Sequence, residues 1–268
     1  MAYMPSNNQT PTTDSIGLPL IDSQEHALFF DVDGTLLDIA PDPEAVVVPI
    51  DLQEALRVLS DGLSGAMALV TGRAVDFIER RFPTYRGPVA ALHGAEFRHP
   101  SGMIERIEPD EHFQLAKDFL YDAALRVRGF VAEDKGSAVG LHYRAAPEKA
   151  ELAYSLVEKA SRLAGPAWSI QRGKMVVELR PATSDKGAAL RRFMAHEPFA
   201  GRAPVAFGDD LTDLSMLKTA VEMGGTAVVI GEAIDQPDAA RLANPGELRR
   251  WLTGLAGKLD EHNNERTS

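Results

Sequence analysis

The stretch Ala27-Leu28-Phe29-Phe30-Asp31-Val32-Asp33-Gly34-Thr35 decides how this chain folds and where its chemistry lies. Four apolar residues followed by two carboxylates are typical of a buried parallel strand whose carboxyl end opens into a binding site. Residues i and i+2 of an extended segment face the same way, so Asp31 and Asp33 point into one cleft. Two carboxylates so placed repel each other, and a hard cation such as Mg²⁺ relieves the repulsion.

Three interpretations of this stretch compete: an acidic turn, a calcium loop and a phosphoryl-transfer site. A helix-loop-helix calcium loop needs glycine at position six and glutamate at position twelve. Counted from Asp31, these positions hold Leu36 and Asp42, so we exclude the calcium loop. In a phosphoryl-transfer site Asp31 would attack phosphorus and Asp33 would move the proton. That chemistry also demands a hydroxyl, a lysine and further carboxylates at later strand ends.

The demanded groups follow in chain order. A second apolar run, residues 65–70, ends at Thr71-Gly72-Arg73. A third, residues 204–207, ends at the stretch Gly208-Asp209-Asp210-Leu211-Thr212-Asp213. Any one of these pieces is a weak signal, but all of them in this order favour phosphoryl transfer over a plain acidic turn.

A lysine with a suitable position lies between the second and third runs. Ser184 or Asp185 can cap a helix that begins close to Lys186, and anions are favoured at such a helix start. A carboxylate nucleophile such as Asp31 is ionised at neutral pH, since its reference pKa is about 3.9. It would repel a phosphate dianion, so Lys186 and a metal ion are needed to neutralise the encounter.

This ordered set resembles the haloacid dehalogenase superfamily of aspartate-nucleophile phosphohydrolases, over residues 28–230. The resemblance implies that Asp31 forms an aspartyl-phosphate. It implies that Asp33 protonates the leaving group, then activates water, and offers its backbone carbonyl to Mg²⁺. Whether Asp210 or Asp213 contacts the metal directly stays open. The implied catalytic residues are Asp31, Asp33, Thr71 and Lys186, and the implied metal ligands are Asp31, Asp33, Asp209 and Asp213.

Residues 100–181 are far more than a connection between two strands needs, so we expect an inserted lid there. Helical spacing of apolar residues at 113–127 and 148–163 indicates two helices. Strand patterns occur at residues 129–133, 138–143, 167–170 and 175–179. The expected fold class is α/β: a Rossmann-like parallel-sheet core with a smaller inserted α+β lid (cap) domain. The expected division is a disordered tail at 1–24, a core at 25–99 and 182–254, a cap at 100–181 and a polar tail at 255–268.

The polar residues of the insert resemble those of trehalose-6-phosphate phosphatases. The similar stretches are Glu133-Asp134-Lys135, His142-Tyr143-Arg144, residues 174–181 and, in the core, Leu92-His93-Gly94-Ala95-Glu96. The resemblance implies that Glu133, Lys135 and Glu178 bind the glucose ring remote from the phosphate. Arg73 could instead form an ion pair, and His93 could be a structural histidine. The candidate substrate-binding residues are Gly72, Arg73, His93, Glu133, Lys135, Arg144, Lys174 and Glu178.

The resemblance therefore implies a Mg²⁺-dependent phosphatase that converts trehalose 6-phosphate into trehalose and phosphate. Other enzymes with the same core and lid stay open as alternatives: phosphatases of sucrose phosphate or mannosyl phosphoglycerate, and a phosphate-shuttling mutase. A catalytically silent sugar-phosphate sensor is the alternative from another class. An intact set of catalytic residues argues against the sensor, because pure binding needs no nucleophile.

Composition limits the partners. A formal net charge of −11 argues against nucleic acid, whose binding needs clustered Lys and Arg. The chain has no cysteine, which excludes a thiolate phosphatase route and disulfides. It has no long apolar run, and its first residues lack the apolar core of a signal peptide. We expect a cytoplasmic enzyme of a small-molecule substrate; the sequence does not report its oligomeric state, and a monomer is the working expectation.

Overall fold

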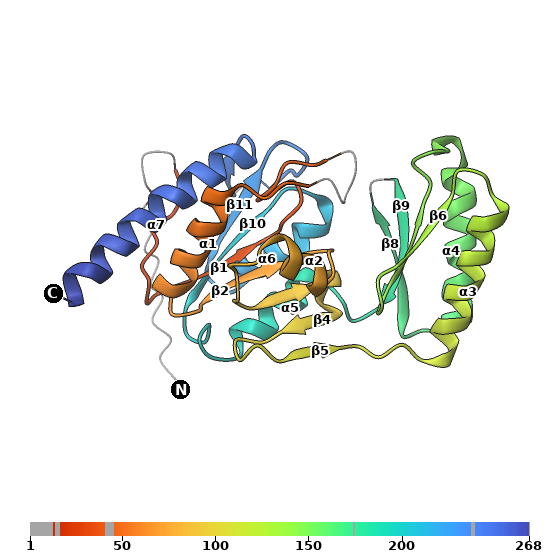
Figure 1. Cartoon of the computed structure of the whole chain (residues 1–268), viewed down its shortest axis with the longest axis horizontal. Helices are drawn as coiled ribbons and strands as arrows, with labels where there is room; N and C mark the ends of the chain where they lie inside the picture. Colours follow the sequence, from red (N-terminus) through yellow and green to blue (C-terminus); the bar gives the residue numbers. More distant parts are fainter. Residues whose placement is uncertain (1–12, 14–16, 41–45, 174, 237–238, 268) are drawn as a thin grey trace, which may run out of the picture.

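The computed structural model describes residues 13, 17–40, 46–173, 175–236 and 239–267. In this part of the chain, the strands form an eight-stranded and a four-stranded sheet. Figure 1 shows that each sheet belongs to a separate unit, with the larger unit also holding the long helix near the C-terminal end of the described residues. The two units lie side by side, and the chain crosses from one to the other and back.

The large sheet is mostly parallel. The pairings from β12 through to β3 are parallel, and β4 and β5 extend the sheet in antiparallel fashion. Its strands are, in spatial order, β12 (Ala240–Leu242), β11 (Thr226–Ile230), β10 (Ala203–Gly208), β1 (His26–Phe30), β2 (Met67–Val70), β3 (Val89–Ala91), β4 (Glu96–Arg98) and β5 (Ile104–Arg106).

Strand β1 lies at the centre of this sheet because its residues 27–30 are fully buried and apolar. Phe30 aligns with Phe207 on β10 and with Leu69 on β2. The rings of Phe30 and Phe207 stack with their centroids 4.6 Å apart. Since the three strands are parallel, they end at the same edge of the sheet. The first polar residues beyond these ends are Asp31, Thr71 and Asp209.

Helices flank the large sheet, and α1 packs on α7 while α5 packs on α6. The side chain of Asp185 accepts hydrogen bonds from the backbone N–H groups of Gly187 and Ala188, so Asp185 is the cap that starts α5 at Lys186. The helical elements of this unit are α1 (Ile50–Gly62), α2 (Val75–Arg81), α5 (Lys186–Met194), α6 (Leu214–Glu222), α7 (Pro245–Thr267) and the short 3₁₀ turns η2 (Leu92–Gly94) and η4 (Leu211–Asp213).

The smaller unit is an antiparallel sheet with two helices on one face. Figure 1 shows the sheet on the side of the large unit and the helices on the outer side. Phe113 stacks on Trp168 within its own hydrophobic cluster, with ring centroids 3.7 Å apart. The elements are, in sheet order, β6 (Val131–Asp134), β7 (Val139–His142), β9 (Val176–Pro181) and β8 (Trp168–Gly173), with α3 (Glu111–Arg126), η3 (Pro147–Lys149) and α4 (Ala150–Ala164). We call residues 111–181 the cap unit and the other described residues the core unit.

This arrangement confirms the expected α/β class with an inserted α+β unit. The division into two domains stays a prediction, which the two separate hydrophobic clusters support. The expected boundary at residue 100 needs a correction, since β5 pairs with β4 and extends the core sheet. Two of the three β5 residues are exposed, so the strand is held by main-chain pairing and carries no clear apolar signal.

Parts of both expected tails pack on the core unit. Helix α7 continues to Thr267, where a polar tail was expected from residue 255. Ala256 is buried, and Leu255 and Leu259 pack on the core, so the helical spacing of apolar residues continues past the expected end. At the other end Leu18 is fully buried in the core, although residues 1–24 were expected to be disordered. The expected tail falls largely outside the described residues.

Candidate active site

Three carboxylates gather at the carboxyl ends of the core strands. One oxygen each of Asp31, Asp209 and Asp213 lies within 4.8 Å of the other two. Asp31 and Asp213 are buried, and Oδ1 of Asp209 accepts a hydrogen bond of 3.1 Å from Thr35 Oγ1. Burial, with the charge of Asp213 next, raises the pKa of Asp209 to about 6. A compact set of oxygen donors with this much negative charge fits a hard divalent cation.

Lys186 is the buried cation of this cluster. Its Nζ lies 2.5 Å from Oδ1 of Asp31 and 2.5 Å from Oδ1 of Asp213. Burial alone would lower the pKa of Lys186, but the ion pairs with Asp213 and Asp31 raise it above its ordinary value. Oδ2 of Asp213 in turn accepts the backbone N–H groups of Asp209 and Asp210, each at 3.0 Å. Lys186 is thus fixed as an ammonium beside Asp31.

Two glycines allow the strand ends to approach so closely. Gly34 has φ +90°, and a Cβ there would lie 2.1 Å from Oδ2 of Asp209. A Cβ on Gly208 would lie 2.4 Å from Cβ of Asp213. A larger residue at either position would push the carboxylates apart.

Asp33 lies at the edge of the cluster and has its own partner. Its Oδ2 accepts from Nε of Arg73 and its Oδ1 from Nη2, each at 2.7 Å. The guanidinium of Arg73 lies 4.3 Å from the centroid of the Phe77 ring. The backbone N–H of Arg73 donates to Oγ1 of the fully buried Thr71 at 3.1 Å. Arg73 therefore connects Asp33 to the Thr71 loop.

The loop at residues 92–94 is tied to the Thr71 loop by its backbone. His93 N donates to Thr71 O at 2.9 Å, and Leu92 N donates to Arg73 O at 3.0 Å. His93 has φ 56°, a conformation that non-glycine residues rarely adopt, and a Cβ on Gly72 would lie 2.9 Å from its Nε2. Burial, with the charge of Lys186 next, lowers the pKa of His93 well below its ordinary value. His93 is therefore a neutral ring held against Gly72.

The cap unit faces this loop with an alternating set of charges. Glu178 is buried, accepts from Nζ of Lys135 and has Oε2 4.0 Å from Nε2 of His93. Glu133 lies across from it, with Oε2 2.7 Å from Nε2 of His142 and 3.7 Å from Nζ of Lys135. The hydrogen bond with His142 is the main cause that lowers the pKa of Glu133. Such alternating acceptors and donors suit sugar hydroxyls, which both donate and accept.

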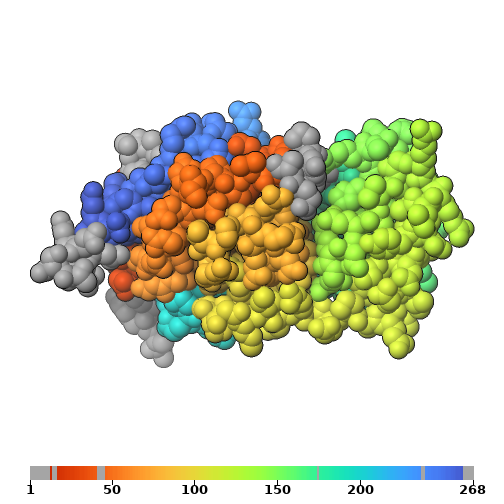
Figure 2. Space-filling view, in the orientation of Figure 1, coloured from red at the N-terminus to blue at the C-terminus, as the bar shows by residue number. Residues whose placement is uncertain are grey.

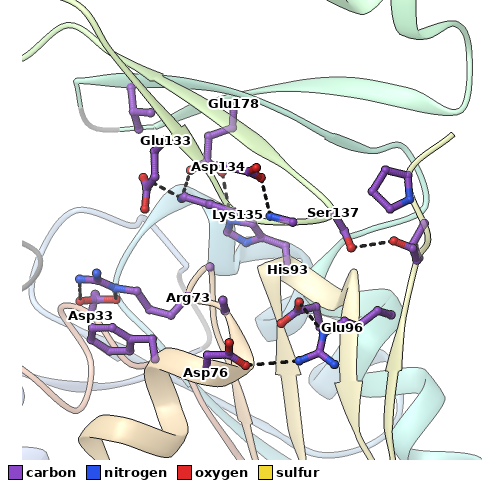
Figure 3. Close-up of a pocket in the computed structure, with 18 of the residues that line it drawn as sticks. Asp33, Arg73, Asp76, His93, Glu96, Glu133, Asp134, Lys135, Ser137 and Glu178 are labelled. Carbon is purple, nitrogen blue, oxygen red and sulfur yellow. Dashed lines mark hydrogen bonds and ion pairs between the residues drawn. The ribbon is translucent and has the colours of Figure 1, made fainter. Parts of the chain in front are cut away.

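A cavity of about 780 Å³ separates the two units. In Figure 2 the green cap unit lies directly beside the orange and yellow core unit, so the cavity is at their junction. Figure 3 shows Glu133, Lys135 and Glu178 on the cap side and the Asp33–Arg73 pair on the core side. The volume is in the range of small-molecule sites.

Comparison of this sequence with known protein families agrees with the geometry of the site. The sequence model of the family Trehalose-phosphatase matches residues 29–241. A probable trehalose-phosphate phosphatase of Sinorhizobium fredii is 45% identical over 88% of this chain and 89% of its own. The chain belongs to the trehalose-phosphatase family. A trehalose-6-phosphate phosphatase of Escherichia coli is 37% identical over 89% of this chain and 90% of its own.

Solved structures that are named as trehalose-6-phosphate phosphatases or related proteins have the same fold as this chain. The C-terminal domain of the C. albicans trehalose-6-phosphate phosphatase has a TM-score of 0.72 at 24% identity, with 88% of this chain and 93% of that chain covered. A trehalose-6-phosphate phosphatase related protein has a TM-score of 0.73 at 23% identity, with 88% and 100% covered. At this identity the likeness concerns the fold alone. Among the described residues of this trehalose-phosphatase family member, none of the helices combines the length and the apolar character that a membrane span requires.

The structure brings together most residues that the sequence singled out. The side chain of Asp33 is outside the carboxylate cluster, so a metal contact from this residue would need its backbone carbonyl, which stays a prediction. Lys174 lies outside the described residues. Eight candidates line the cavity: Asp33, Gly72, Arg73, His93, Glu133, Lys135, Arg144 and Glu178.

Sequence reasoning gave no role to several residues that hold this site. Thr35 was quoted with the first motif, but only the fold shows its hydrogen bond to Asp209. Glu96 is buried, accepts from the backbone N–H of Val75 at 2.9 Å and pairs with Arg106 Nε at 3.1 Å. Glu96 therefore joins the start of α2 to β5. Glu96 was quoted with the stretch 92–96 and begins the short strand β4, but only the fold shows its two partners.

Proposed function

We propose that this protein hydrolyses trehalose 6-phosphate to trehalose and inorganic phosphate, as a step in trehalose biosynthesis. The observation that carries the proposal is the pairing of Asp31 with Lys186 at the strand ends, two residues before Asp33, which lines a cavity together with the charged face of the cap unit. Membership of the trehalose-phosphatase family supports the sugar phosphate as substrate.

In the first step Asp31 attacks phosphorus while the bond from phosphorus to the sugar oxygen breaks. The leaving sugar oxygen takes a proton from Asp33, and an aspartyl-phosphate forms on Asp31. In the second step water attacks this phosphorus and the bond from phosphorus to Asp31 breaks, while Asp33 takes the proton of the water. Phosphate leaves, with Asp31 restored as the carboxylate and Asp33 as the carboxylic acid. Thr71 and Lys186 would hold phosphate oxygens in both steps.

The carboxylate set fits Mg²⁺, with Asp31, Asp209 and Asp213 as the residues that would hold it. Bound there, the ion would supply positive charge between the nucleophile and the phosphate. The choice of Mg²⁺ over other divalent ions is part of the proposal, since oxygen sites accept several of them.

On the cap side, Glu133, Lys135 and Glu178 would bind the glucose ring remote from the phosphate. This assignment is supported by their position on one face of the β6–β7–β9 sheet, which turns toward the cavity (Figure 3). His93 and Arg144 line the same space and would contact the substrate or its surroundings. A cytoplasmic location and a monomeric state stay predictions.

Release of phosphate from a panel of phosphorylated sugars tests this function. We expect trehalose 6-phosphate to give the highest kcat/KM with Mg²⁺ present. Preference for sucrose phosphate or mannosyl phosphoglycerate would assign the site to a related phosphatase. Transfer of phosphate to an acceptor sugar would indicate a mutase, and calorimetric binding of trehalose 6-phosphate without release would indicate a sensor.

A further inference from the structure

The Asp33–Arg73 pair poses a chemical problem for the proposed reaction. Both oxygens of Asp33 accept a short hydrogen bond from the guanidinium, at 2.7 Å each. Two-point pairs of this kind are among the stronger charged contacts and fix both groups in one plane. A carboxylate oxygen held in this way cannot donate a proton to a leaving group or accept one from water. Asp33 is thus withheld from the proton transfer that the proposed function assigns to it.

Arg73 is held in this position from the core side. Its guanidinium lies over the ring of Phe77, which is buried in the core unit, at 4.3 Å from the ring centroid. Its backbone is fixed at both ends of the residue, by Thr71 Oγ1 and by the N–H of Leu92. The backbone of Asp33 also has a partner, since it bridges to Leu37, but its side chain is 32% exposed and lines the cavity. The arginine is the anchored partner and the carboxylate the movable one.

The cap unit brings a competing carboxylate to the same cavity. Figure 3 shows Glu133 on the cap side, above the Asp33–Arg73 pair. Glu133 is 48% exposed at its side chain, and Arg73 is among the positive groups that help to lower its pKa, after the hydrogen bond from His142. Approach of the cap would therefore bring a second anion to Arg73.

We propose that Arg73 is a positioning residue that holds Asp33 until a substrate which engages the cap brings Glu133 to the guanidinium and frees Asp33. This inference rests on the proposed phosphatase function and adds a source of selectivity to it. A small phosphate ester has no second sugar for the cap to bind, so it leaves Asp33 held. The Asp33–Arg73 pair thus slows the hydrolysis of small phosphate esters in general. This discrimination adds to that from binding of the correct sugar by the cap unit.

The test compares three substrates in the wild type and in Arg73→Ala. Trehalose 6-phosphate engages the cap, glycerol 3-phosphate does not, and p-nitrophenyl phosphate has a leaving group that needs no proton. For Arg73→Ala we expect the kcat ratio of glycerol 3-phosphate to trehalose 6-phosphate to rise by about fivefold, the scale of one partly exposed ion pair. The stopped-flow burst of nitrophenolate, which reports attack on phosphorus, should keep its rate.

Two further variants separate the effect of the two-point contact from the effect of net charge. Arg73→Lys keeps the charge but not the two-point contact, so it should raise the ratio less than alanine does; a ratio as low as in the wild type would contradict the proposal. Arg80→Ala removes another arginine that lines the cavity from α2, and it should leave the ratio unchanged. An equal rise in Arg80→Ala would attribute the effect to net charge and overturn the role of Arg73.

Other outcomes of these measurements also test the role proposed for Arg73. A slower nitrophenolate burst, with parallel losses on the two alkyl esters, would make Arg73 a phosphate-binding residue and overturn the proposal, as would an unchanged ratio. If Arg73→Ala does not fold, the Arg73→Lys ratio decides alone. Failure of the proposed function is visible separately, because the wild type would then release no phosphate from trehalose 6-phosphate.

Discussion

Nζ of Lys186 lies 2.5 Å from Oδ1 of Asp31, although 155 residues separate them in the chain. The same ammonium serves Asp213, so one positive charge faces several negative charges in a dry space. Burial and the charge of Asp213 raise the pKa of Asp31, and Lys186 opposes that rise. The cluster lacks positive charge, which is the physical reason to expect that it requires a divalent cation.

Replacing the nucleophile should separate activity from folding. Asp31→Asn keeps the size of the side chain and removes one of the crowded charges, so the variant should melt near the wild-type temperature. Turnover should fall at least about a thousandfold, as for other catalytic nucleophiles. Phosphate release and a thermal melt are the measurements. Asp260→Asn, at an exposed residue of α7 outside the cluster, is the matched control and should stay active.

Removing the buried ammonium should cost stability. Lys186→Met leaves Asp31 and Asp213 buried without their cation, which typically costs about 3–5 kcal/mol. Urea unfolding in EDTA measures the free energy of unfolding. The double variant Lys186→Met with Asp213→Asn should recover part of the loss, since one of the two charges is gone. A single variant as stable as the wild type would show that the pair carries little weight in folding.

The pH dependence of metal binding follows from Asp209. Burial, then Asp213, raises its pKa to about 6 in the folded chain, against about 3.9 when unfolded. The folded chain thus holds this proton more tightly, so without metal the stability that Asp209 contributes is present below about pH 4 and is lost as the pH rises through about 6. Mg²⁺ needs the ionised form. The rise in melting temperature on adding Mg²⁺ should be larger at pH 7.5 than at pH 5, and Asp209→Asn should reduce the difference.

The core of the site could be predicted because each motif follows an apolar run. Buried parallel strands end at one edge of a sheet, so Asp31, Thr71 and Asp209 had to meet there. The partners of side chains could not be predicted in the same way. The spacing of Arg73 fitted a ligand contact and an ion pair equally, and only the fold shows that Asp33 is its partner.

The limits of the cap unit were also harder to predict. Strand β5 belongs to the core sheet through main-chain hydrogen bonds, which leave little trace in the pattern of its side chains. Glu96 and Arg106 pair across β4 and β5, and this contact depends on the same strand pairing. Local patterns thus predicted the elements of the cap, and pairing between distant segments set its boundary.

Gly72 should not tolerate a side chain. The added Cβ of Gly72→Ala would lie 2.9 Å from Nε2 of His93, so the imidazole would have to shift toward the cavity that it lines. Overpacking of this kind typically costs about 1–3 kcal/mol. A thermal melt should show the loss, and the added change His93→Ala should relieve it. Gly254→Ala, in α7 with nothing near its Cβ, is the control and should be neutral or slightly stabilising.

The cap carboxylates should decide which sugar is accepted. In Glu178→Gln the buried charge beside Lys135 is lost, and a sugar hydroxyl loses a charged acceptor, which is worth about 10- to 100-fold in kcat/KM. We expect that loss for trehalose 6-phosphate and a change below about threefold for glycerol 3-phosphate, which does not reach the cap. Glu133→Gln should show the same loss on trehalose 6-phosphate and the same small change on glycerol 3-phosphate. Glu151→Gln, exposed on α4, should change neither rate. Equal losses on both esters would assign Glu133 and Glu178 a structural role in the cap sheet.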